Sequence, residues 1–135
     1  MVRDSDKKMP VGSAMTENAN MAFERVFEKV YWWVEQIPSG KVMTYGQISR
    51  LMDERLSARA VGWAMHAIPN NNRKIPWHRV INSRGGISTT KLLNHAPNLQ
   101  RHLLEEEGVQ FNKQGLIDLA TYQWQPPAHL VYAKE

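Results

Sequence analysis

The chain has 135 residues, a net charge of +4 and no cysteine, which excludes disulfides, thiolate chemistry and cysteine-ligated zinc sites. Its length suits one domain with a real hydrophobic core, and it contains no run of about 20 apolar residues that could cross a bilayer. The segment from Met1 to Asn20 is polar and lacks the apolar core of a secretion signal, so we expect a cytoplasmic protein, nucleoid-associated if it is bacterial.

The N-terminal part of the chain is predicted to hold a tail and one helix. Residues 1–18 mix charged, polar and glycine residues without a period, which is typical of a mobile tail. The apolar residues that follow recur at spacings of four, three, four and three, as on one face of an amphipathic helix: Phe23, Phe27, Val30, Val34 and Ile37. Residues 38–40, Pro-Ser-Gly, are expected to end that helix.

Two short helices joined by a turn are predicted next. The first runs from Tyr45 to about Asp53, and the second from its N-cap Ser57 to Ile68. Apolar residues at i, i+3, i+4 and i+7 pack the second helix on the core: Val61, Ala64, Met65 and Ile68. Its opposite face is expected to present Arg59, Gly62, Trp63 and His66. The arrangement is a helix-turn-helix pattern, which is typical of DNA-binding proteins.

The remaining elements are predicted to be a hairpin and a helix. Residues 78–88 place apolar positions around a Gly-rich turn, which predicts a β-hairpin. Residues 98–107 form a helix closed by Gly108 as its C-terminal cap. Residues 109–124 are expected to be extended or irregular.

These elements define the expected fold class and domain organisation. The fold class is mostly α with a short β-hairpin, a single helix-turn-helix domain of winged-helix-like type. The domain is expected to span residues 19–125, between the tail at 1–18 and a second tail at 126–135.

Positive charge is concentrated in the middle of the chain. Between Lys41 and Arg101 there are ten basic residues against Asp53 and Glu54, a balance of +8, so the two ends together carry −4. A basic segment between acidic ones suggests a surface for a polyanion, most simply nucleic acid. A merely solvated basic face gives the same count, so charge alone leaves both interpretations open.

Six short motifs occur in one order along the chain: Pro-Ser-Gly-Lys-Val at 38–42, Thr-Tyr-Gly at 44–46, Ala-Arg-Ala-Val-Gly at 58–62, Pro-Trp-His-Arg-Val at 76–80, Glu-Gly at 107–108 and Ile-Asp-Leu at 117–119. Together they resemble the C-terminal domain of the O6-alkylguanine-DNA alkyltransferases over residues 21–124. Those repair proteins transfer an alkyl group from guanine to their own cysteine. Trp77 stands at the position of that cysteine, as it does in the transfer-less branch, the alkyltransferase-like proteins.

The resemblance implies a non-enzymatic damage sensor. Such a protein binds double-stranded DNA containing O6-alkylguanine through the minor groove, flips the base into a Trp-lined pocket and marks it for nucleotide excision repair proteins. We expect a monomer with no cofactor, no metal and no membrane partner. The small residues of the second helix, among them Ala60, Gly62 and Ala64, independently suit a minor groove only about 6 Å wide.

The resemblance also assigns DNA contacts. Arg59 matches the arginine that enters the base stack, and Tyr45 matches the tyrosine beside the phosphate of the flipped nucleotide. Taken alone, Arg59 reads as an ordinary phosphate contact and Tyr45 as a packing residue. Trp63 either caps the groove edge or packs on the first helix. The expected DNA-binding set is Thr44, Tyr45, Gln47, Arg59, Ala60, Gly62, Trp63 and His66.

The expected lesion pocket is built around Trp77, whose indole can stack on a base. The frequency with which tryptophan is buried in proteins would by itself predict a core residue here. The full expected pocket is Tyr45, Trp77, His78, Val80, Ser88, Thr89 and Thr90, with Lys91 as a neighbouring candidate contact.

The family pair that deprotonates the cysteine matches His78 and Glu107. With no thiol to activate, we expect these two residues and Arg79 to support the pocket. The family's Asn hinge is assigned to Asn70, with Asn71 and Asn72 as alternative registers.

Two other functions compete with the sensor. The first is an enzyme of glycosylase or hydrolase type that uses His78 and Glu107 on the flipped base. The second is a helix-turn-helix transcription regulator, against which the Ala- and Gly-rich second helix argues because it offers few side chains to read base edges.

Overall fold

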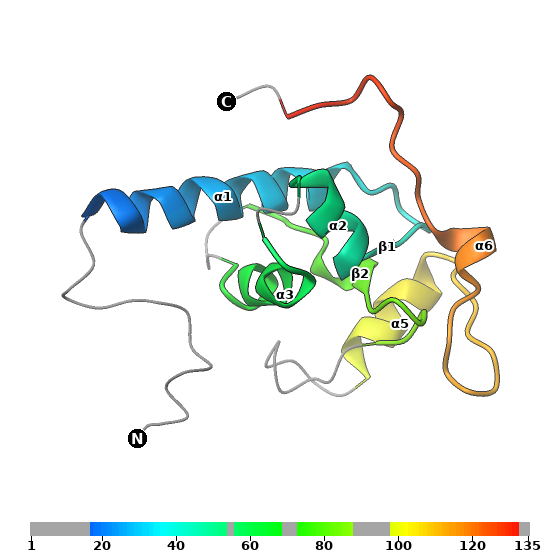
Figure 1. Ribbon diagram of the computed structural model, residues 1–135. Helices are drawn as coiled ribbons and strands as arrows, with labels where there is room; N and C mark the ends of the chain where they lie inside the picture. Colours follow the sequence, from blue (N-terminus) through cyan, green and yellow to red (C-terminus); the bar gives the residue numbers. More distant parts are fainter. Residues whose placement is uncertain (1–16, 54–55, 69–72, 88–97, 133–135) are drawn as a thin grey trace.

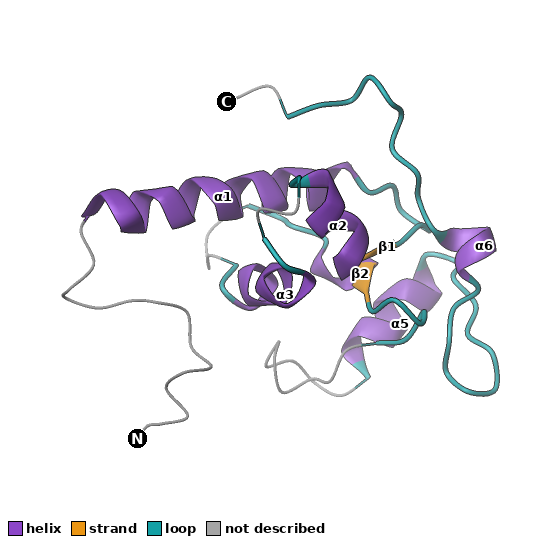
Figure 2. Cartoon of the chain, viewed as in Figure 1, coloured by secondary structure: helices purple, strands orange, loops and turns teal. Residues whose placement is uncertain are grey.

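The computed structural model describes residues 17–53, 56–68, 73–87 and 98–132. In chain order its elements are α1 (Glu17–Gln36), β1 (Met43–Thr44), α2 (Tyr45–Leu51), α3 (Ala58–His66), the 3-10 turn η2 (Trp77–Arg79), β2 (Val80–Ile81), α5 (Leu99–Glu106) and α6 (Leu119–Tyr122). Figure 2 shows how little of the chain is strand, and the mostly helical fold class is confirmed. None of the described helices is long and apolar enough to cross a membrane.

Helix α1 forms one side of the molecule, with α3 packed beneath it (Figure 1). The predicted inward face is confirmed from Phe27 onward, because Phe27, Val30, Val34 and Ile37 are all buried. The helix is longer than its pattern indicated and already includes residues 17 and 18, which were assigned to the tail. The side chain of Phe23 lies outside the described residues.

The helix-turn-helix is present, and its second helix has the predicted N-cap Ser57. Ser57 Oγ accepts a hydrogen bond from the backbone N–H of Ala60 at 3.0 Å, which begins α3 where expected. The turn before α3 is closed by Ser49, whose hydroxyl donates to the carbonyl of Leu56 at 2.6 Å. Both helices end about two residues earlier than predicted, at Leu51 and His66.

The sheet differs from the predicted hairpin. Strand β2 pairs in parallel with β1, in the register Met43↔Val80 and Thr44↔Ile81. Successive residues of β2 are both fully buried, as is usual for parallel strands covered on two faces, whereas a hairpin at the surface alternates. The predicted turn itself forms, since the Asn82 N–H donates to the Gly86 carbonyl at 3.0 Å. The prediction was therefore right about the turn and wrong about the pairing.

Gly85 shows why this turn requires glycine. Its φ is +89°, and a Cβ at this position would lie 2.4 Å from the carbonyl oxygen of Ile117. The close approach allows the Ile117 N–H to donate to the Gly85 carbonyl at 2.8 Å. The turn is thereby attached to a second apolar cluster, which consists of Val42, Ile81, Leu104, Val109 and Ile117.

The C-terminal part is more ordered than predicted. Helix α5 ends at Glu106, one residue earlier than predicted, and Gly108 follows its C-cap with a φ of +97°, as expected of a terminating glycine. The Val109 N–H donates to the Leu104 carbonyl at 3.0 Å. The segment predicted to be extended or irregular contains α6, whose N-cap Asp118 accepts from the Ala120 N–H at 3.1 Å. Within the predicted tail, the ring of Tyr132 lies 5.5 Å from that of Trp32 on α1.

Candidate lesion pocket and nucleic-acid interface

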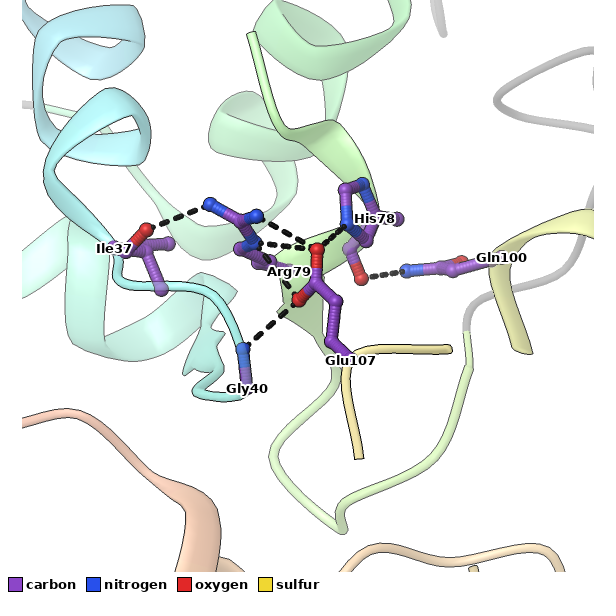
Figure 3. A network of polar contacts seen from close by, with 6 residues as sticks. All are labelled: Ile37, Gly40, His78, Arg79, Gln100 and Glu107. Carbon is purple, nitrogen blue, oxygen red and sulfur yellow. Dashed lines mark hydrogen bonds and ion pairs between the residues drawn. The ribbon is translucent and has the colours of Figure 1, made fainter. Parts of the chain in front are cut away.

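The carboxylate of Glu107 lies at the centre of a network of polar contacts (Figure 3). His78 Nε2 lies 2.8 Å from Glu107 Oε2, and Arg79 Nη2 donates to the same oxygen at 2.6 Å. The other oxygen, Oε1, accepts from Arg79 Nε and from the Gly40 N–H, each at 3.0 Å. Arg79 Nη1 also donates to the Ile37 carbonyl at 2.9 Å. One carboxylate therefore joins the end of α1, the η2 turn and the end of α5.

These contacts keep Glu107 ionised. Burial opposes ionisation, but it is outweighed by the hydrogen bonds from Arg79, Gly40 and His78, and the pKa of Glu107 falls from 4.5 to about 2. At neutral pH the residue is a carboxylate whose two oxygens are both occupied by donors.

Gln100 fixes the backbone on either side of Arg79. Its side-chain amide donates to the carbonyl of His78 at 3.1 Å and to that of Val80 at 2.9 Å. The side chain is almost fully buried, so these bonds are shielded from water. The η2 turn is therefore held from α5 as well as from Glu107.

Trp77 opens this turn and is half-buried. Its indole packs against the main core, with its ring centroid 5.9 Å from that of His78 in an edge-on arrangement. The indole also borders an open hollow of about 450 Å³, whose lining is Glu35, Lys74, Ile75, Pro76, Trp77, His78, Arg79 and Leu103.

The other predicted pocket residues divide into two groups. Tyr45 is 9% exposed and Val80 is fully buried, and both belong to the core cluster on which Trp77 packs. Ser88, Thr89, Thr90 and Lys91 lie outside the described residues, as does the predicted hinge at Asn70 with its neighbours Asn71 and Asn72. The structure places Trp77 beside His78 and against the core cluster that contains Tyr45 and Val80. The assignment of these residues to a lesion pocket stays a prediction.

Helix α3 presents few side chains to solvent. Arg59 and His66 are exposed, as the interface prediction requires. Trp63 is half-buried against the core, and the guanidinium of Arg59 lies 6.0 Å from its ring centroid. Trp63 thus packs on the core and supports Arg59, and its contact with the groove edge stays a prediction.

The predicted outward placement of Gly62 is wrong, because this residue is buried. Ala60, a member of the expected DNA-binding set, is 9% exposed. A residue with little or no side chain is readily covered by its larger neighbours, so the helix is slim through small residues that face inward. The exposed surface of α3 is accordingly smaller than the predicted face.

Thr44 and Gln47 are also placed differently from the prediction. They are 4% and 6% exposed and form a reciprocal cap at the start of α2, in which the Gln47 N–H donates to Thr44 Oγ1 at 3.0 Å. Gln47 Nε2 further donates to the Trp124 carbonyl at 2.6 Å. Their side chains are buried and hydrogen-bonded inside the fold, so their role as DNA contacts stays a prediction.

The basic segment is partly neutralised by the acidic flanks. Arg73 pairs with Glu28 and Glu35, Arg79 with Glu107, and Arg101 with Glu105. Sequence analysis did not find these pairs, nor the support from Gln100, since each partner except Glu105 is remote in sequence. The i,i+4 spacing of Arg101 and Glu105 was an available signal for their pair, and the spacing of Glu28 and Glu35, two helical turns apart, placed those two side chains on one side of α1.

Comparison with known proteins agrees with the geometry. Residues 25–109 match the family model of the 6-O-methylguanine DNA methyltransferase DNA-binding domain. The chain therefore belongs to this family, as its motifs predicted.

Several similar relatives are named as alkyltransferase-like or DNA base-flipping proteins. The chain is 42% identical over 111 residues to alkyltransferase-like protein 1 of Schizosaccharomyces pombe, covering 78% of this chain and all of the relative. It is 41% identical over 98 residues to the DNA base-flipping protein of Vibrio parahaemolyticus, covering 73% and 94%. The crystal structure of S. pombe Atl1 with damaged DNA containing O6-carboxymethylguanine matches with a TM-score of 0.66 and 41% identity, covering 76% of this chain and 97% of that one.

Proposed function

We propose that the protein is a non-enzymatic sensor of alkylated DNA, which binds duplexes containing O6-alkylguanine and flips the damaged base toward Trp77. The observation that carries the proposal is the tryptophan at the family's acceptor position in a chain without cysteine. Alkyl transfer requires a thiolate, and an indole cannot supply one. Relatives named for base flipping, and a relative solved with damaged DNA, support the same function.

The geometry of α3 suits a minor-groove approach. Its buried small residues make the helix slim, and Arg59 stands exposed in its first turn above the Trp63 ring. A planar guanidinium held there can enter the gap left by a flipped nucleotide and stack on the neighbouring bases. The flipped base then meets Trp77, whose indole offers a contact worth roughly 1–3 kcal/mol by stacking.

A sensor without chemistry needs a second protein to remove the lesion. We propose that nucleotide excision repair proteins perform this step after the bound complex has marked the site. The choice of this pathway rests on the family resemblance. The substitution at Trp77 requires only that another protein excise a lesion that is bound but unchanged.

The competing glycosylase or hydrolase function is disfavoured by the state of Glu107. A general base needs an oxygen free to accept a proton, and both oxygens of this carboxylate already accept hydrogen bonds from Arg79. Its low pKa, about 2, also makes the carboxylate a weak base. The regulator alternative is disfavoured because α3 exposes few side chains for reading bases.

A titration tests the proposal. Two duplexes of identical sequence, one with a single O6-methylguanine, are titrated with the protein, and 2-aminopurine beside the lesion reports unstacking. We expect tighter binding to the lesion duplex together with a rise in 2-aminopurine fluorescence. Equal affinity for both duplexes, with no fluorescence change, would contradict the proposal.

A further inference from the structure

Arg73 lies in the chain between α3 and the η2 turn that begins at Trp77, and its side chain binds α1. Its Nε donates to Glu35 Oε2 at 2.7 Å and its Nη2 donates to Glu35 Oε1 at 2.8 Å, a two-pronged pair. Its Nη1 binds Glu28. The guanidinium also lies 5.8 Å from the ring centroid of Tyr31. Three groups of one helix thus hold a single side chain.

The three α1 residues share one face of the helix. Glu28, Tyr31 and Glu35 are separated by three and four positions, so their side chains form a single stripe. The same stripe holds α3, because the Tyr31 hydroxyl donates to the Ala64 carbonyl at 2.8 Å in a buried contact. Burial and the nearby Glu28 raise the pKa of Tyr31 to about 12 against the opposing charge of Arg73, so the hydroxyl keeps its proton. One stripe of α1 is therefore attached to both DNA-facing parts.

The link from Arg73 to Trp77 is short and stiff. Ile75 is buried, and Pro76 has a restricted φ, here −76°. A residue before proline is itself confined to extended conformations. Fixing Arg73 therefore limits the positions that Trp77 can take relative to α3.

We propose that Arg73 is a positioning residue for lesion recognition, which sets the Trp77 turn at a fixed place relative to α3 by binding the Glu28–Tyr31–Glu35 stripe of α1. The inference rests on the proposed function. Flipping places a base between α3 and the Trp77 turn, which are separate in the chain. Binding is strongest when these two elements already have the relative position that the flipped base requires. Arg73 fixes that relative position without contacting the lesion.

Affinities for matched duplexes with and without one O6-methylguanine test the proposal, as the ratio of the two dissociation constants. Arg73→Gln removes the charge and the two-pronged hydrogen bonding, and we expect the ratio to fall by about 5- to 150-fold, the usual range for coupling between sites. Arg73→Lys keeps the charge but cannot form the two-pronged pair, so it should lie between Arg73→Gln and wild type.

The matched control is Arg101→Gln. Arg101 is likewise an arginine paired with a glutamate, Glu105 at 3.1 Å, and stacked near an aromatic ring, Phe111 at 4.6 Å. Its pair lies within α5 and joins no second element. Losing it removes one positive charge from the protein, and we expect the lesion ratio to stay within about twofold of wild type.

Circular dichroism and thermal melting establish folding for each variant. A folded Arg73→Gln variant with the wild-type ratio overturns the proposal, even if it is less stable, because a purely structural contact predicts that result. If Arg73→Gln does not fold, Glu28→Gln is tested in its place, because it removes the Glu28 contact of Arg73 and keeps the Glu35 pair. An unchanged ratio of dissociation constants in a folded Glu28→Gln variant would also overturn the proposal. A wild-type protein without lesion preference overturns the proposed function first, so the two failures are distinguishable.

Discussion

His78 Nε2 lies 2.8 Å from Glu107 Oε2, although the neighbouring residue is a tryptophan and has no thiol for this pair to deprotonate. The contact belongs to a carboxylate that also binds Arg79 and the backbone of Gly40. A pair that serves thiol activation in the family is here part of the scaffold that carries Trp77. Its consequences should appear in stability and its pH dependence.

Glu107 should make the free energy of unfolding depend on acid pH. Its folded-state pKa, about 2, lies below the ordinary value of 4.5, so its contribution is fully present above about pH 4.5 and is lost as the pH falls through 2. With solvent screening, the contribution is on the order of 2 kcal/mol. Urea unfolding at a series of pH values should show a wild-type advantage over Glu107→Gln that shrinks across this window.

The control for this series is Glu105→Gln, which removes an exposed carboxylate two positions earlier. It should change the free energy of unfolding by no more than about 1 kcal/mol. An advantage over Glu107→Gln that stays constant from neutral pH down to pH 2 would show that the carboxylate is not stabilised by its partners.

The salt dependence of binding should reflect the basic residues that remain outside internal pairs. Described members include Arg50, Arg59, Lys74 and Arg84. If about four to six phosphates are neutralised, a plot of log affinity against log salt should have a slope of roughly −3.5 to −5.5. Lesion and undamaged duplexes should give similar slopes, and a salt-independent affinity would mean that the basic stretch does not face DNA.

Arg59→Ala should weaken binding to lesion DNA by on the order of 1–3 kcal/mol, because the guanidinium no longer offsets the cost of unstacking. Fluorescence anisotropy with a lesion duplex measures the loss. Arg84→Ala, an exposed arginine of the 82–86 turn, is the charge-matched control and should cost less. Equal losses for the two variants would make Arg59 an ordinary phosphate contact.

Trp77→Ala should erase most of the preference for damaged over undamaged duplex and leave weak general binding, since only a base in the pocket meets this indole. The variant also removes packing from the core, so folding is checked by circular dichroism. Trp32→Ala, which removes another half-buried tryptophan from α1, is the control and should keep the preference. A folded Trp77→Ala protein that still discriminates the lesion as well as wild type would refute the pocket assignment.

Local signals predicted the helices well. The spacing from Phe27 to Ile37, the N-cap Ser57 and the C-terminal Gly108 each act within a few residues, and each was found where expected. Helix α6 was missed because a single turn has no periodicity to detect, although its cap Asp118 was visible in the sequence.

Long-range contacts could not be predicted in the same way. The parallel pairing of Met43 with Val80, and the binding of Arg73 to α1, join residues that no local pattern connects. Thr44 and Gln47 illustrate a related limit, because polar residues at a helix start are equally suited to binding DNA and to capping. Family motifs identified Trp77, His78, Arg79 and Glu107, but only the structure shows that His78 and Arg79 share the Glu107 carboxylate.

The most direct test of recognition without chemistry is the mass of both components after binding. A duplex with one O6-methylguanine is incubated with excess protein under conditions where the complex is shown to form, and protein and lesion strand are weighed by mass spectrometry. Because the chain has no cysteine, we predict that both masses are unchanged and that the damaged base keeps its methyl group and glycosidic bond. A protein heavier by a methyl group, or a strand that has lost its base, would contradict the account.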